Sequence, residues 1–272
     1  MNARGSPWER SCRMKRLVLL KIGGKAAENQ ASLKALAEEM RALSAQSSFI
    51  LVHGGGAEVT SISQKLGITS VFSNGLRQTS AAEMDVVDMV LAGKINKQLV
   101  RLLRSQGLDA VGLSGADGGI LTGKSVGALP DGSPSRTGEV VGVDNRLLSA
   151  LLAKDFLPVI SSPAMDMAGI PLNLNADTAA FGIAVSLGCS ALVFLSDIPG
   201  ILSDGRIIQE LQPAQAEALA ASGVITGGMI PKVSASVDAL GRGVSTVIIG
   251  QYEEPGSLAA LLEGRKGTRL WK

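Results

Sequence analysis

Short apolar segments alternate along the chain with segments in which apolar residues recur at helical spacing. The strand-like segments are residues 16–22, 49–52, 110–113, 157–161, 191–195 and 246–249, and the helical ones are residues 33–43, 57–66, 81–91, 95–105, 146–154, 177–187, 213–222, 231–241 and 257–263. Strands separated by helices form a mainly parallel sheet with helices on both faces. We therefore predict an α/β fold with an open, mainly parallel sheet sandwiched between helices. Residues 117–145, rich in Gly, Pro, Ser and Asp, are expected to form hairpins and loops.

The composition argues against several classes of protein. Apolar residues make up 46% of the 272 residues, which is enough for a substantial core. The net charge of +2 and the 3% of aromatic residues do not favour binding to nucleic acid or to a membrane. One histidine, His53, and two cysteines, Cys12 and Cys189, are too few for a histidine-based metal site or a disulfide framework. We expect a cytoplasmic protein that acts on a small molecule and has no protein-held metal.

The first 13 residues differ in character from the rest of the chain. The apolar run that follows them ends at Lys21, which makes it too short for the core of a signal peptide. We expect residues 1–13 to be a disordered tail, or to precede the true start of the protein at Met14.

Glycine-rich turns follow the first two predicted strands. They read Lys21-Ile-Gly-Gly24 and His53-Gly-Gly-Gly56. Glycine lets the backbone approach a ligand and expose its N–H groups, and a following helix adds the positive end of its dipole. Each turn alone is also explained as an ordinary tight turn. The two together, with Lys21 at a strand tip, favour a site that encloses one phosphoryl group. We expect His53 to be structural.

Four polar residues occur where a ligand would need them, although each also has a structural explanation. Lys232 is predicted in the first turn of a helix, where it opposes the helix dipole unless an anion lies nearby. Asp177 would cap a helix, hold nearby lysines in place, or do both. Arg77 is either an exposed loop residue or a residue that binds a carboxylate through two parallel (bidentate) hydrogen bonds. Asn173 is either a turn residue or a substrate ligand.

One motif is expected to be coincidental. Residues 118–125, Gly-Gly-Ile-Leu-Thr-Gly-Lys-Ser, match the P-loop pattern letter for letter. A P-loop needs a helix that begins at the Lys-Ser step, whereas the residues that follow here include Gly127 and Pro130 and do not continue as a helix. We therefore predict that Lys124 takes no part in nucleotide binding.

Nine segments, taken in order, resemble the amino-acid kinase family, and within it the branch that phosphorylates N-acetyl-L-glutamate in arginine biosynthesis. They are residues 21–24 (KIGG), 52–56 (VHGGG), 74–77 (NGLR), 92–97 (AGKINK), 111–117 (VGLSGAD), 173–180 (NLNADTAA), 195–200 (LSDIPG), 227–232 (GGMIPK) and 267–268 (GT). Each motif is modest, but their order and spacing are specific, and the resemblance runs from about residue 14 to the C-terminus.

The resemblance implies two lobes, with residues 14–172 binding the acyl amino acid and residues 173–272 binding ATP. The γ-phosphoryl group of ATP would pass to the side-chain carboxylate of the acceptor, with Mg²⁺ held mainly by ATP. Lys21 and Lys232 would neutralise charge on the transferring group, and Asp177 would orient both lysines. The residues implied in acceptor binding are Gly54, Gly55, Arg77 and Asn173, with Arg77 on the α-carboxylate. The residues implied in ATP binding are Gly23, Gly24, Ser196, Asp197, Gly200, Ile201, Leu202, Gly228 and Met229.

Two alternatives remain open at this level. The segments around residues 53–58 and 112–118 are also similar to kinases of lysine biosynthesis that act on carrier-linked aminoadipate, although residues 74–77 and 173–177 favour acetylglutamate. A non-catalytic ligand sensor on the same fold is the other alternative. Arginine-inhibited members of the family carry an N-terminal helix that links dimers into hexamers. Gly5 and Pro7 do not favour such a helix here, so we expect a homodimer without arginine feedback.

Overall fold

The computed structural model describes residues 15–23, 29–73, 75–129, 131–203, 205–225 and 229–272. The tail expected at residues 1–13 lies outside this part of the chain, as do the site residues Gly24 and Gly228. Among the described helices, none combines the length and the apolar character that crossing a bilayer requires.

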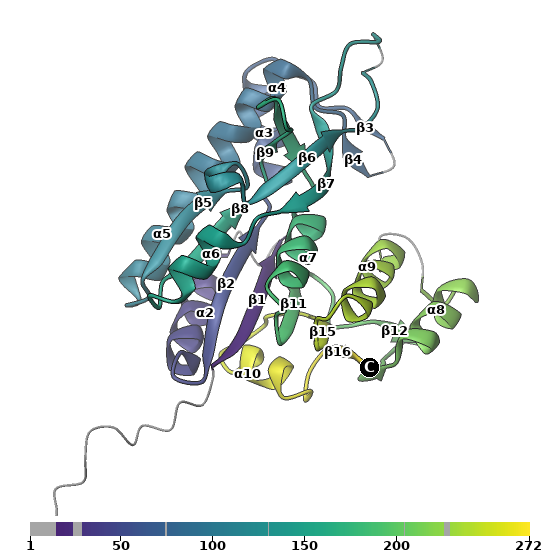
Figure 1. Cartoon of the computed structure of the whole chain (residues 1–272). Helices are drawn as coiled ribbons and strands as arrows, with labels where there is room; N and C mark the ends of the chain where they lie inside the picture. The colour runs from purple at the N-terminus through teal and green to yellow at the C-terminus, as the bar shows by residue number, and fades with distance from the viewer. Residues whose placement is uncertain (1–14, 24–28, 74, 130, 204, 226–228) are drawn as a thin grey trace, which may run out of the picture.

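Eight strands of the described residues form one sheet, in the order β14-β16-β15-β11-β1-β2-β8-β5 (Figure 1). Their bounds are β1 (Arg16–Ile22), β2 (Ser47–His53), β5 (Ala110–Ser114), β8 (Leu157–Ser161), β11 (Ala191–Leu195), β14 (Glu210–Leu211), β15 (Thr246–Gly250) and β16 (Thr268–Trp271). β16 runs antiparallel to β15, whereas the other neighbouring pairs are parallel. The predicted open, mainly parallel sheet is confirmed.

Helices cover both faces of this sheet. Their bounds are α2 (Gln30–Leu43), α3 (Gly56–Lys65), α4 (Ala81–Val87), α5 (Asn96–Ser105), α6 (Arg146–Leu152), α7 (Ala176–Ser186), α8 (Pro213–Ala221), α9 (Met229–Gly241) and α10 (Ser257–Leu262). Residues from α2, α5 and α10 join one core cluster with the sheet, and residues from α6, α7, α8 and α9 join the other. The predicted sandwich is therefore confirmed.

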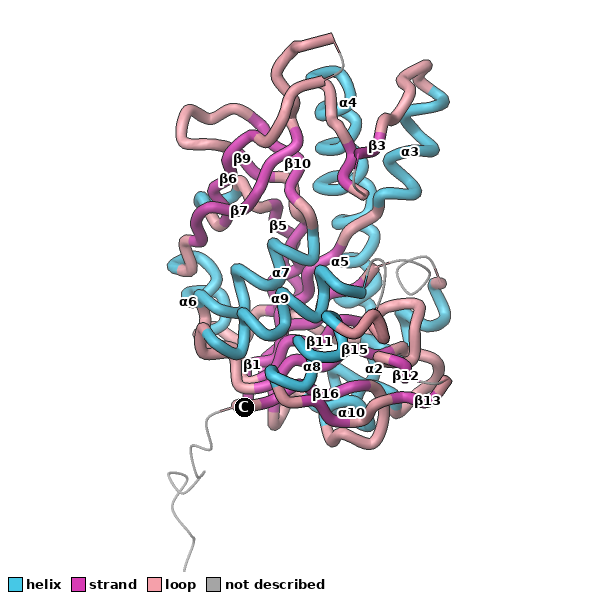
Figure 2. Tube along the Cα trace, turned by 90° about the vertical axis from the view of Figure 1, so that its right-hand side faces the viewer, coloured by secondary structure: helices cyan, strands magenta, loops and turns pink. Residues whose placement is uncertain are grey.

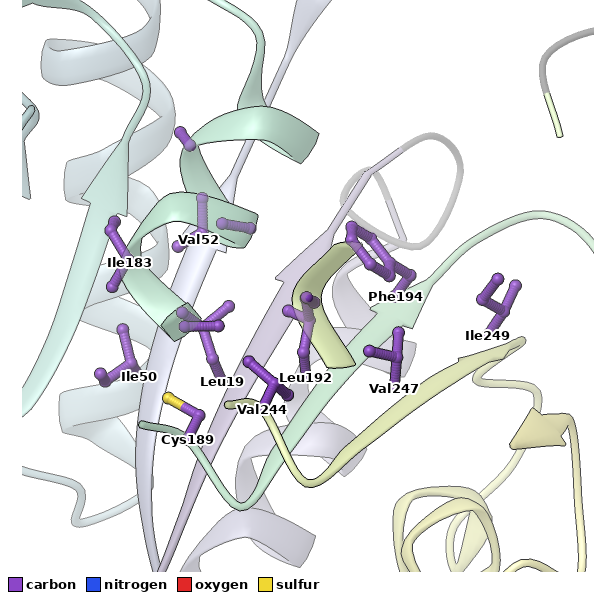
Figure 3. Packing of buried hydrophobic residues seen from close by; sticks show 14 of the residues in the cluster. Leu19, Ile50, Val52, Ile183, Cys189, Leu192, Phe194, Val244, Val247 and Ile249 are labelled. Atoms are coloured by element: carbon purple, nitrogen blue, oxygen red, sulfur yellow. The ribbon is translucent and has the colours of Figure 1, made fainter. Parts of the chain in front are cut away.

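Successive side chains of the central strand β1 pack alternately into these two core clusters. Val18 and Leu20 belong to the cluster on the α2 face. Leu19 belongs to the cluster on the α7 face, part of which Figure 3 shows. Successive side chains of a strand point to opposite faces. Lys21, two residues after Leu19, therefore points to the α7 face at the carboxyl end of the strand.

Residues 81–105 form one continuous helical run instead of the two helices predicted there. A π-helical segment, Asp88–Ile95, joins α4 to α5, and the residues that flank it keep right-handed helical backbone angles. The wider i→i+5 turn carries the chain past Gly93 without a break, and such segments often occur near functional sites. Asn96, the first residue of α5, is fully buried and its Nδ2 donates to the carbonyl oxygen of Val159 at 2.9 Å. This bond fixes the helical run against the sheet.

A second, smaller group of strands lies beyond one end of the main sheet. It consists of β6 (Leu121–Ser125), β7 (Thr137–Val143), β9 (Ala164–Met165) and β10 (Pro171–Leu174). Figure 2 shows these strands at the same end of the molecule as α3, α4 and β3. The structure confirms the hairpin expected within residues 117–145 and places Lys124 on β6, so no helix begins at the Lys-Ser step. The expected absence of a P-loop helix is confirmed for these described residues, and the prediction that Lys124 takes no part in nucleotide binding remains to be tested.

Two short hairpins and several short strands were not predicted from the sequence. The hairpins are β3 (Phe72–Ser73) with β4 (Leu76–Arg77), and β12 (Leu202–Ser203) with β13 (Arg206–Ile207). Each strand has two residues, too few for a period-2 pattern to be recognised. The first hairpin matters for function because it carries Arg77.

Candidate active site

Two cavities open beside the carboxyl ends of the central strands. The first has a volume of about 520 Å³ and the second about 280 Å³, and Lys21 and Gly23 line both. In open, mainly parallel sheets, ligands bind at this edge. The shared wall is therefore the place where a group can pass from a ligand in one cavity to a ligand in the other.

The side chains of Lys21 and Asp177 meet at this wall. Lys21 Nζ lies 2.6 Å from Asp177 Oδ1, and the two side chains are 14% and 28% exposed. Asp177 is in the first turn of α7, where the helix dipole favours a negative charge. Its predicted role as the N-cap is wrong, because Asn175 Oδ1 accepts from the backbone N–H groups of Asp177 and Thr178 at 2.7 and 3.3 Å. The carboxylate of Asp177 is thus left to pair with Lys21.

The first cavity brings together most of the residues predicted to bind ATP. Those that line it are Gly23, Ser196, Asp197, Gly200, Ile201, Leu202 and Met229, together with Lys232. Ile198 lies within the stretch 196–202 that the sequence predicted to line the nucleotide site, whereas Leu195, Val224 and Ile225, which give the cavity additional apolar wall, were missed. Leu195 adjoins the predicted Ser196, and that adjacency was the available signal. Lys21 and Lys232 therefore share one cavity. Within the described residues Asp177 forms an ion pair with Lys21 but none with Lys232. The expectation that Asp177 orients Lys232 therefore stays a prediction.

The second cavity brings together the residues predicted to bind the acceptor. Gly54, Gly55, Arg77 and Asn173 all line it. Gly55 has φ +153°, and a Cβ atom there would lie 2.2 Å from Cδ1 of Ile95 on the π-helical segment. The positive φ strains any residue that has a side chain, and the end of the Ile95 side chain would also have to move, so the tight turn favours glycine.

Arg77 is neither exposed nor in a loop. Its side chain is 7% exposed and lies on β4. Nη1 donates to Glu83 Oε1 at 2.7 Å and to Ser70 Oγ at 2.5 Å, and Nη2 donates to the carbonyl oxygen of Gly56 at 2.9 Å and to Thr60 Oγ1 at 2.8 Å. These contacts fix the plane of the guanidinium at the cavity wall and balance its charge. Sequence reasoning missed Glu83, since a glutamate in the first turn of a helix has an ordinary explanation.

His53 lies at the end of β2 and supports the site from within the core. It is fully buried, its Nδ1 lies 2.9 Å from the carbonyl oxygen of Gly54, and its Nε2 lies 3.1 Å from Nδ2 of Asn96. A carbonyl only accepts and the amide nitrogen only donates, so the ring is the neutral tautomer with its hydrogen on Nδ1. Burial lowers the pKa of His53 from 6.5 to about 4. The ring is therefore neutral at pH 7, which agrees with the structural role expected for it.

A metal site made by the protein is not found in the described part of the chain, because no three His, Cys, Asp or Glu side chains there are grouped closely enough to hold an ion.

Comparison with known proteins identifies the family. The model of the amino acid kinase family matches residues 16–251. The chain is 42% identical over 237 residues to acetylglutamate kinase of Geobacillus kaustophilus, covering 87% of this chain and 90% of that protein. It is 40% identical over 265 residues to acetylglutamate kinase of Chloroflexus aurantiacus, covering 94% of this chain and 97% of that protein.

A solved structure shows the same fold at lower identity. Carbamate kinase from Giardia lamblia bound to AMP-PNP has a TM-score of 0.73 and 17% identity, covering 95% of this chain and 99% of that one. This likeness shows the fold alone. The family model spans most of the described chain, and two relatives at 40% identity or more match nearly their whole length, so the chain belongs to the amino acid kinase family.

Proposed function

We propose that this protein transfers the γ-phosphoryl group of ATP to the side-chain carboxylate of N-acetyl-L-glutamate, forming an acyl phosphate in arginine biosynthesis. The observation that carries the proposal is the pair of cavities that meet at Lys21 and Asp177. Similarity to two acetylglutamate kinases over most of their length supports the choice of acceptor.

The smaller cavity suits the acceptor. It is lined by Arg77, by Asn173 and by the glycines of the β2–α3 turn. Both Nη groups of Arg77 are held by protein acceptors, so the α-carboxylate of the acceptor would meet Nε–H or replace a hydroxyl contact. The side-chain carboxylate would then lie toward Lys21. Most of the cavity lining comes from residues 14–172, which supports the proposed division into an acceptor lobe and an ATP lobe.

The larger cavity suits ATP. Its apolar wall, with Ile201 and Ile225, fits a base, and Lys21 and Lys232 are available to the phosphates. Mg²⁺ would enter with ATP, held mainly by phosphate oxygens and water, and would offset part of the phosphate charge. Gly24 and Gly228, which belong to the same proposed set, lie outside the described residues.

Phosphoryl transfer to a carboxylate requires alignment of the two substrates and stabilisation of charge, and it does not require a general base. The acceptor carboxylate is already ionised at neutral pH, so no proton has to be removed from it. Phosphoryl transfer brings two anionic partners together and spreads charge over the equatorial oxygens. Lysines and backbone N–H groups that are fixed beforehand lower the barrier because they need no reorganisation during the step. In this arrangement Asp177 holds Lys21 rather than touching the acceptor.

The experiment that tests this proposal traps the product. Purified protein, ATP, Mg²⁺ and N-acetyl-L-glutamate are incubated with hydroxylamine, which converts an acyl phosphate into a hydroxamate. We expect hydroxamate that depends on both ATP and the acceptor. Signal only with carrier-linked aminoadipate would move the activity to lysine biosynthesis, and nucleotide binding without turnover of any acidic amino acid would indicate a ligand sensor.

On the same resemblance we propose that the protein is a cytoplasmic homodimer. Sedimentation velocity of the purified protein would test the oligomer, with one species of twice the chain mass expected. A stable monomer or hexamer would contradict it.

A further inference from the structure

Buried hydroxyl groups connect the chain next to Arg77 with the strand that carries Asn173. Thr79 and Thr137 are 0% and 7% exposed. The backbone N–H of Thr79 donates to Thr137 Oγ1 at 3.0 Å, and Asn173 Nδ2 lies 2.9 Å from Thr79 Oγ1. Asn173 is also paired in register with Thr137, because β10 and β7 run in parallel. The side chain of Asn173 is therefore held from behind by Thr79, which water does not reach.

The carbonyl oxygen of Arg77 determines which atoms donate and which accept in these hydrogen bonds. The backbone carbonyl oxygen of Arg77 lies 3.3 Å from Thr79 Oγ1 and 2.5 Å from Thr137 Oγ1. A carbonyl cannot donate, so each threonine uses its single hydroxyl hydrogen on this oxygen. Thr79 Oγ1 then meets Asn173 only as an acceptor. The atom of Asn173 that faces Thr79 must be the NH₂ group, and Oδ1, which branches from the same carbon, faces away from Thr79.

This orientation matters because Asn173 lines the acceptor cavity whereas Thr79 is fully buried behind it. An amide fixed in this direction offers the cavity an oxygen that accepts hydrogen bonds. The opposite direction would offer a donor, which suits a carboxylate or carbonyl oxygen of the ligand. An acylated α-nitrogen has one N–H group, and that group needs an acceptor.

We propose that Thr79 is a positioning residue that sets the direction of the Asn173 amide and so makes the site select acceptors with an N–H group on the α-carbon. The inference rests on the proposed function, since it concerns the acceptor of the same reaction. Sites built around a hydrogen bond discriminate strongly against an analogue that lacks the matching group, because a polar group is then left unpaired.

The experiment compares two acceptors and three proteins. The acceptors are N-acetyl-L-glutamate and 2-acetoxyglutarate, in which an ester oxygen replaces the N–H group, and turnover is followed by ADP release. The proteins are the unaltered enzyme, Thr79→Val, which keeps the shape and removes the hydroxyl, and Thr79→Ser, which keeps the hydroxyl. We expect the unaltered enzyme to prefer the amide by roughly 10- to 100-fold in kcat/KM.

In Thr79→Val this preference is expected to fall to within about threefold of equality, through a KM for N-acetyl-L-glutamate that rises by nearly the same factor, roughly 10- to 100-fold. The KM for ATP and kcat should stay close to those of the unaltered enzyme, and Thr79→Ser should keep most of the preference. A purely structural role would lower activity toward both acceptors equally.

Two results would overturn the inference. One is an unaltered enzyme that phosphorylates the ester as efficiently as the amide. This result would contradict the selection for an N–H group even if Thr79→Val does not fold. The other is a Thr79→Val enzyme that retains the full preference. If instead the unaltered enzyme phosphorylates neither acceptor, the proposed function fails, and that result is distinct from both.

Discussion

The ammonium group of Lys21 lies 2.6 Å from the carboxylate of Asp177, and Lys21 lines both cavities. Strand alternation brings this lysine to the α7 face, and the capping of α7 by Asn175 leaves Asp177 available to it. The pair is therefore a product of two local features, the register of β1 and the start of α7. Its position between the two cavities places a positive charge where a phosphoryl group would pass from one ligand to the other.

Removal of either lysine charge should slow the chemical step. Lys21→Met and Lys232→Met keep the length of the side chain and remove the charge that offsets the transferring phosphoryl group. By analogy with the loss of a single donor to a developing anion, we expect kcat to fall roughly 10²- to 10³-fold. Steady-state kinetics with thermal unfolding of each variant would measure this. A variant with normal unfolding and normal kcat would contradict the role of that lysine.

Lys124 provides the matched control for these variants. It is exposed on β6, and its place in a P-loop pattern has no helix behind it. Lys124→Met should leave kcat and the KM for ATP unchanged within about twofold, because the loss of a surface charge has little effect on stability or on a remote site. Loss of nucleotide binding in this variant would restore the P-loop as the ATP site.

Glu83→Gln should weaken acceptor binding more than catalysis. The substitution keeps the shape but removes the charge that pairs with Arg77 in a buried contact of 2.7 Å. We expect the KM for N-acetyl-L-glutamate to rise roughly 10-fold, with the KM for ATP unchanged, and the free energy of unfolding to fall by about 3 kcal/mol because the Arg77 charge loses its partner.

Glu58→Gln is the control for that variant. Glu58 pairs with Lys94 on a partly exposed surface, where such pairs contribute about 0–1 kcal/mol. Its KM values and unfolding should resemble those of the unaltered enzyme. Equal effects of the two substitutions on the acceptor KM would argue against a specific role for Glu83.

The stability of the protein should depend on pH through His53. Its pKa is about 4 in the folded protein and about 6.5 as a free side chain, so the unfolded chain binds the proton more readily between these values. Stability is then fully present above pH 6.5 and is lost as the pH falls toward 4, by about 3 kcal/mol in total.

A variant isolates this contribution because His53 is the single histidine of the chain. Carboxylates titrate in the same range, but they do so in both proteins. Urea unfolding of the unaltered protein and of His53→Asn between pH 4 and 7 should show a steeper loss in the unaltered protein. Parallel curves would mean that His53 binds its proton as readily in the folded protein as in the unfolded chain, which would contradict the lowered pKa.

The main elements of the fold could be predicted from local patterns in the sequence. The alternation of apolar residues in β1 fixes which face each side chain meets, and the two glycine-rich turns fall at strand ends, as expected for a ligand site. These features depend on neighbours within a few residues, so they are readable without coordinates.

Other features depend on groups that are far apart in the sequence. Asn175 and Asp177 are both good caps, and the choice between them is understood only once Lys21 is seen beside Asp177. Likewise, the pairing of Arg77 with Glu83 and of Asn173 with Thr79 arises because a hairpin, a helix and the small group of strands meet in space. No periodic pattern marks these residues.

The most direct test of the two-cavity account is a crystal structure of the protein with Mg²⁺, ADP, aluminium fluoride and N-acetyl-L-glutamate. We predict the planar fluoride group between the two ligands within hydrogen-bonding distance of Lys21 Nζ and Lys232 Nζ, with ADP against Ser196 and Ile201 and the acceptor against Arg77 and Asn173. A complex in which the nucleotide occupies another surface, or in which the two ammonium groups lie away from the fluoride, would contradict the account.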